Sequence, residues 1–102
     1  MRLELTASNL KLSDKYRLKV TNRFTKAIDK YLLHLNDDLK KGTIVITKNS
    51  RFGYESKFDM KLPFGHLFAS SRSQRLFAGL MDLRDRVKKQ LRKELDKLRN
   101  TY

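Results

Sequence analysis

One segment of the chain constrains the fold more than any other, because its side chains alternate between two classes. From Arg51 to Leu62 every apolar residue falls on an even position and every charged residue on an odd one. A period of two residues is that of a β-strand with one buried face and one face in water. The segment therefore predicts a strand from Phe52 to Leu62 in a sheet whose second face is uncovered.

Three further segments are typical of strands. Apolar and polar residues alternate over residues 2–7, and Thr43–Thr47 is β-branched throughout, a composition that favours strands. Pro63–His66 has the residue types of a tight hairpin connection. It predicts a fourth strand at Leu67–Ser71, paired with the one before it.

Two longer stretches have the spacing of amphipathic helices. After Ser13, a residue type that caps helices, apolar side chains recur every three or four residues, and we expect a helix from Asp14 to Leu35. A second helical period begins at Gln74 and continues through Leu98. The order of elements predicts an α+β fold, β-α-β-β-β-α, in which a four-stranded sheet carries both helices on one face.

Size and charge narrow the function. The 102 residues include 24 Lys and Arg but only 11 Asp and Glu, which gives a formal net charge of +13. We expect one domain over residues 1–102, and so large an excess indicates a polyanionic partner, with nucleic acid ahead of anionic lipid. The chain has no cysteine, no signal-peptide pattern and no apolar run near the roughly 18 residues of a membrane span, so we expect a soluble cytoplasmic protein.

Nothing in the sequence indicates catalysis. His34 and His66 have no partner at the spacing of a metal site. Gly53 and Gly79 are isolated, and we expect them to mark close packing and not a phosphate-binding loop. We therefore expect no enzyme, metal, cofactor or small-molecule substrate.

The positive charge is expected on the outward faces of the two helices. The less neutralised stripe of the second helix comprises Arg75, Arg86, Lys89, Lys93 and Lys97. A shorter stripe, beside Asp85 and Asp96, comprises Lys88, Arg92 and Arg99. The outward face of the first helix has Lys15, Lys19, Arg23, Lys26 and Lys30. An ordinary solvated surface is the alternative, but the acids are too few to pair with these bases, which favours a partner rich in phosphates.

Most aromatic residues fall on predicted core faces. Phe64 and Phe68 are the exceptions, because Phe68 shares its strand face with His66 and Ser70. Exposed rings can stack on nucleic-acid bases, and the sequence leaves open whether these two do so.

The last helix and the order of elements resemble one known family, the ribosome hibernation promoting factors and ribosome-associated translation inhibitors. The most specific part is QRLFAGL at 74–80 followed by DRVKKQLRK at 85–93, which is similar to the family's Met-Tyr-x-Ala-Ile and Asp-Lys-Leu-x-Arg-Gln-Leu-x-Lys. The LFAS strand at 67–70 is similar to the family's hydrophobic-x-Ala-Ser strand. The resemblance extends from the first strand to about Lys97.

This resemblance implies a fold related to double-stranded RNA-binding domains. It also implies docking on the small ribosomal subunit, in the channel used by messenger and transfer RNA, where occupancy alone blocks translation. The candidate contacts with ribosomal RNA are Arg23, Lys26 and Lys30 on the first helix and Arg75, Arg86, Lys89, Arg92, Lys93 and Lys97 at or on the second.

Departures from the family pattern leave alternatives open. Arg75 stands where the family usually has an acid, and Phe77 and Leu80 replace Tyr and Ile. Because the chain ends at Tyr102, it resembles the short form without the C-terminal dimerisation domain, and we expect a monomer away from the ribosome. A structural ribosomal protein or a general duplex-RNA binder of the same topology is the alternative. A membrane-surface helix is disfavoured, because the sheet needs the apolar side of the second helix.

Overall fold

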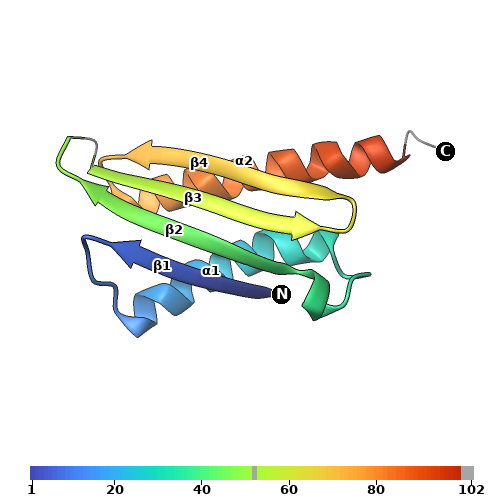
Figure 1. Cartoon of the computed structure of the whole chain (residues 1–102), viewed down its shortest axis with the longest axis horizontal. Helices are drawn as coiled ribbons and strands as arrows, with labels where there is room; N and C mark the ends of the chain where they lie inside the picture. Colours follow the sequence, from blue (N-terminus) through green and yellow to red (C-terminus); the bar gives the residue numbers. More distant parts are fainter. Residues whose placement is uncertain (52, 100–102) are drawn as a thin grey trace.

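The computed structural model describes residues 1–51 and 53–99 and has the expected order of elements (Figure 1). The strands and long helices are β1 (Arg2–Ser8), α1 (Asp14–Ile28), β2 (Lys41–Asn49), β3 (Gly53–Leu62), β4 (Gly65–Ser73) and α2 (Leu76–Arg99). Two short 3-10 helices, η1 (Asp29–Tyr31) and η2 (Asp37–Leu39), lie between α1 and β2. Phe52, which the alternation assigns to a strand, lies outside the described residues, as does the side chain of Arg99.

The strands form one mixed sheet in the order β1-β2-β3-β4. β1 and β2 are parallel, with α1 as the crossover between them, whereas the two later pairs are antiparallel. Only Pro63 and Phe64 separate the paired residues Leu62 and Gly65, as the hairpin prediction requires. The α+β fold class is confirmed.

Both helices cover the same face of the sheet, and the opposite face is open (Figure 1). The alternation in β3 is confirmed, because Phe58, Met60 and Leu62 are buried while Lys57 and Lys61 are exposed. The core between sheet and helices comprises Leu5, Val20, Phe24, Ile28, Leu32, Ile44, Ile46, Phe58, Met60, Leu62, Leu67, Leu80, Leu83, Val87 and Leu91. The apolar sides of both helices are therefore packed against the sheet.

The prediction that the first helix extends to Leu35 is wrong, because α1 ends at Ile28. The parallel pairing of β1 and β2 explains this. The chain has to return to the edge where β1 begins, and α1, at about 22 Å, matches the length of β1, at about 23 Å, whereas a helix to Leu35 would be about 33 Å long. Leu32 is still fully buried, so the apolar spacing is kept by a tighter turn.

Local signals in the sequence are also confirmed. The Ser13 hydroxyl accepts a hydrogen bond from the Tyr16 N–H at 3.1 Å, as an N-cap does. A Cβ on Gly53, which has φ +81°, would lie 2.7 Å from the Cα of Gln74, and a Cβ on Gly79 would lie 2.9 Å from the Cβ of Ser73, so both glycines mark close packing. In the part of the chain that the structure describes, neither helix has the length and apolar character needed to cross a membrane.

Candidate nucleic-acid interface

The net charge of the protein is concentrated in the helix layer. α1 and α2 together contain thirteen Lys and Arg, five in α1 and eight in α2, against five Asp and Glu, one in α1 and four in α2. The four strands contain six Lys and Arg against three acids. The helix layer therefore has a charge of +8, and the strands have +3.

All nine residues that the sequence indicates as nucleic-acid contacts are exposed. Arg23 and Lys26 are on α1, Lys30 is on η1, and Arg75 immediately precedes α2. The remaining five are on α2: Arg86, Lys89, Arg92, Lys93 and Lys97. The fold thus leaves every predicted contact accessible from solvent.

The two helices meet at Phe77, near the start of α2. The Lys19 ammonium nitrogen is 4.4 Å from the centre of the Phe77 ring, and the Arg23 guanidinium carbon is 5.7 Å from it. A cation over an aromatic face is attracted by the negative face of the ring. This contact brings the basic face of α1 against α2, and the sequence offered no sign of it, because Phe77 reads there only as an apolar position.

The side of α2 that faces α1 carries the shorter basic stripe. Lys88 follows Phe77 by about three helical turns, so both lie on the same side of the helix, with Arg92 one turn further on. An open hollow on this surface is lined by Asp85, Lys88, Lys89, Arg92, Lys93 and Asp96. The two stripes of α2 therefore meet in one surface, in which four cations outnumber two carboxylates.

Arg86 lies on the other side of α2, next to β4. Its Nε donates to Asp82 Oδ2 at 2.9 Å, and it lines a hollow with Phe68 and Ser70. The Ser71 hydroxyl, which donates to Asp82 at 2.7 Å, and the Arg86 guanidinium hold the pKa of Asp82 below its ordinary value, against the effect of burial.

Ion pairing separates the predicted contacts into two groups. Besides the Arg86 pair, Lys97 Nζ lies 3.5 Å from Glu94 Oε1. By contrast, Lys89 and Lys93 form no ion pair with any residue that the structure describes. The expectation that this stripe is the less neutralised of the two is therefore wrong among the described residues. Arg86 and Lys97 have carboxylate partners, whereas Lys88 and Arg92 of the shorter stripe form no ion pair there.

Within residues 1–51 and 53–99, no group of three or more His, Cys, Asp or Glu side chains is arranged to hold a metal ion. His66 Nε2 instead pairs with Asp59 Oδ1 at 2.9 Å.

Comparison with known proteins identifies the family. A family model described as sigma 54 modulation protein / S30EA ribosomal protein matches residues 3–99. The chain belongs to this family. Among its curated relatives, proteins named ribosome hibernation promoting factor are similar over 99 residues, with 27% identity in Escherichia coli and 26% in Salmonella typhimurium. In both cases the similarity covers 97% of this chain and 98% of the relative.

Solved structures agree with the S30EA fold. The Thermus thermophilus Protein Y N-terminal domain superposes with a TM-score of 0.74 at 19% identity, covering 91% of this chain and 98% of that one. A ribosomal subunit interface protein from Coxiella burnetii gives a TM-score of 0.64 at 19% identity, covering 91% and 96%. Neither the S30EA family description nor the name of any of these proteins is that of an enzyme, in agreement with the expectation from sequence.

Proposed function

We propose that this member of the S30EA family is a ribosome hibernation factor, which binds small-subunit ribosomal RNA through the helix layer and blocks the channel for messenger and transfer RNA. The observation that carries the proposal is the set of cations gathered on α2, the half-buried Lys88 and the exposed Lys89, Arg92 and Lys93. Family membership and the names of the curated relatives support the ribosome as the partner.

The mechanism needs binding alone. Lysine and arginine side chains displace the counterions of RNA phosphates and position the protein without reading base sequence. Specificity for one site then comes from the fit between the shape of the folded RNA and a two-layer body that is 17 Å along its shortest axis. A protein held in this way inhibits translation for as long as it occupies the channel.

Arg23, Lys26 and Lys30 extend the same surface. The contact of Lys19 and Arg23 with Phe77 fixes α1 beside α2, so cations from both helices act on one partner. Arg75, Arg86 and Lys97 lie at its margins, and Arg86 and Lys97 must exchange a carboxylate for a phosphate in order to bind. We expect them to contribute less than Lys89 and Lys93.

Sucrose-gradient fractionation of growing and starved cells tests this function. A hibernation factor moves into the small-subunit and whole-ribosome fractions on starvation and leaves them when growth resumes. Constant stoichiometric presence in both states would instead indicate a structural ribosomal protein. Sedimentation with duplex RNA as readily as with ribosomes would indicate a general duplex binder. Light scattering of the purified protein checks the further expectation of a monomer away from the ribosome.

A further inference from the structure

The open face of the sheet, on the side away from the helix layer, carries a row of basic side chains. Arg2 of β1 is paired in register with Lys41 of β2. Continuing the β2–β3 register by one position places Lys61 beside Lys41, and Lys61 is paired with His66 of β4. The three cations span β1 to β3, His66 lies beside them on β4, and all four side chains are exposed.

Cations on facing strand positions repel one another, which makes this row unfavourable without a partner. Arg2, Lys41 and Lys61 form no ion pair within the part of the chain that the structure describes. Acids at the same end are engaged elsewhere, because the Met1 ammonium binds Asp37 at 2.7 Å and the buried Lys40 binds Asp29 at 2.8 Å.

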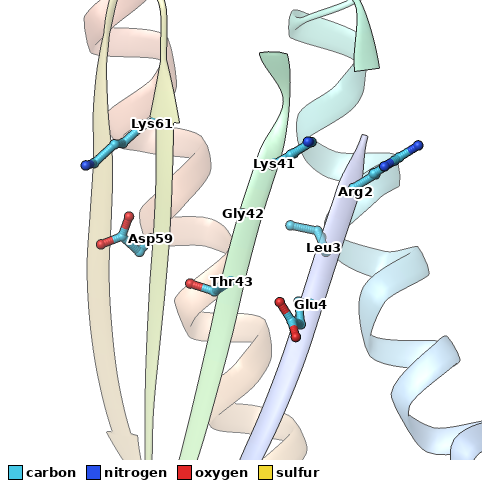
Figure 2. A pocket seen from close by; sticks show the side chains of 8 residues that line it. All are labelled: Arg2, Leu3, Glu4, Lys41, Gly42, Thr43, Asp59 and Lys61. Atoms are coloured by element: carbon cyan, nitrogen blue, oxygen red, sulfur yellow. The ribbon is translucent and has the colours of Figure 1, made fainter. Parts of the chain in front are cut away.

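The cations border a shallow hollow on this face, which Figure 2 shows from close by. Arg2 and Lys41 lie next to each other where β1 and β2 begin, with Lys61 on β3. Two carboxylates, Glu4 and Asp59, also line the hollow. Asp59 also pairs with His66 at 2.9 Å, and both carboxylates oppose an anionic ligand, against the three cations Arg2, Lys41 and Lys61.

An exposed aromatic ring lies on the same face. Phe68 of β4 is 51% exposed, and its ring centre is 6.4 Å from that of His66, the residue paired with Lys61. Exposed rings beside cations are the combination with which proteins hold single-stranded nucleic acid, since bases stack on the ring while phosphates pair with the cations.

We propose that the open sheet face is a second nucleic-acid site, which binds single-stranded RNA with phosphates on Arg2, Lys41 and Lys61 and a base stacked on Phe68. The site lies on the opposite side of the sheet from the helices. It does not depend on the proposed ribosomal role, and its test uses no ribosome.

Binding of a labelled oligouridine of about ten nucleotides, within the length range that single-strand-binding domains cover, is the direct test. We expect Phe68→Ala to weaken binding at least about fivefold, because stacking on the ring is lost. Val45→Ala is the matched control, because Val45 is also a partly exposed apolar residue on this face but lies outside the row, and it should leave binding unchanged.

Two further variants separate this site from the helix layer. Replacing Arg2, Lys41 and Lys61 together by Gln should flatten the dependence of log affinity on log salt by about 2, since each lost phosphate contact removes about 0.7. Glu4→Gln should strengthen binding. A variant with Lys89→Glu and Lys93→Glu should still respond to Phe68→Ala by the same factor, because the ring acts on the other face.

Three results would overturn the proposal. The first is unchanged oligouridine binding in Phe68→Ala, and the second is complete loss of single-strand binding in the helix variant alone. The third is that the protein binds anionic phospholipid vesicles through Arg2, Lys41 and Lys61 and does not bind oligouridine. That result would make the face a membrane contact.

Discussion

Lys19 of α1 holds its ammonium nitrogen 4.4 Å from the centre of the Phe77 ring of α2. With Arg23 on the same ring, this contact joins two helices that are each packed on the sheet. The exposed cations of α1 and α2 consequently belong to one surface. Arg23, which is one of the predicted RNA contacts, thus also takes part in the contact between the two helices.

Replacing Phe77 by Leu should weaken this junction while keeping an apolar side chain in place. We expect a coupling free energy between Phe77→Leu and Lys19→Met of about 0.5–1 kcal/mol, the usual size of an exposed cation–π contact. A double-mutant cycle of urea unfolding measures it. Additive effects of the two substitutions would show that the ring and the ammonium do not stabilise each other.

The buried Lys40 provides a second test. Its Nζ binds Asp29 at 2.8 Å, and this hydrogen bond raises the pKa of Lys40 above its ordinary value, against desolvation. Asp29→Asn should lower the urea midpoint more than Lys40→Met does. The Asp29 variant leaves the buried Lys40 ammonium with Asp37, at 3.5 Å, as its remaining carboxylate partner. Equal losses in the two variants would mean that the charge pair has no special role.

Asp82 should make stability depend on acid pH. Its pKa is lowered in the folded protein, first by the Ser71 hydroxyl, so its contribution is present above the ordinary pKa of 3.8 and is lost as the pH falls through the folded value. Asp82→Asn should therefore be less stable than the natural chain at pH 7, and the difference should shrink below pH 3.8. Thermal unfolding at several pH values measures this, and a difference that stays constant would contradict it.

Much of the fold can be predicted from the sequence, because the periodicity of β3 and of α2 is decided by which face is buried. The end of α1 cannot be predicted in this way. The spacing of Leu32 continues a helical pattern, but the parallel pairing of β1 with β2 requires the chain to turn before Leu32. The pairing of β1 with β2 therefore determines where α1 ends.

The candidate site likewise has features that the sequence predicts and features that it does not. Exposure of the seven bases within α1 and α2 follows from the helical wheel, whereas Lys30 and Arg75 lie outside both helices. The pairing of Arg86 with Asp82 is visible in the sequence as a four-residue spacing. The contact of Lys19 with Phe77 joins residues 58 positions apart, so no local pattern could reveal it. The cationic row on the sheet depends on register, which the sequence did not specify.

Binding to small ribosomal subunits should weaken steeply with salt. If the helix layer neutralises about six phosphates, log affinity plotted against log salt should have a slope between about −4 and −5. Titration with purified subunits at several salt concentrations measures the slope. A flat response would contradict an interface made of phosphate contacts.

Charge reversal on α2 tests the central claim most directly. A variant with Lys89→Glu and Lys93→Glu should fold normally, as judged by circular dichroism, because both side chains are exposed and without ion pairs among the described residues. The control variant, with Lys11→Glu and Lys48→Glu, changes the charge equally but outside both helices. Co-sedimentation with purified small subunits should be lost in the α2 variant and kept in the control. Retention of binding by the α2 variant would show that the helix layer is not the surface that meets the ribosome.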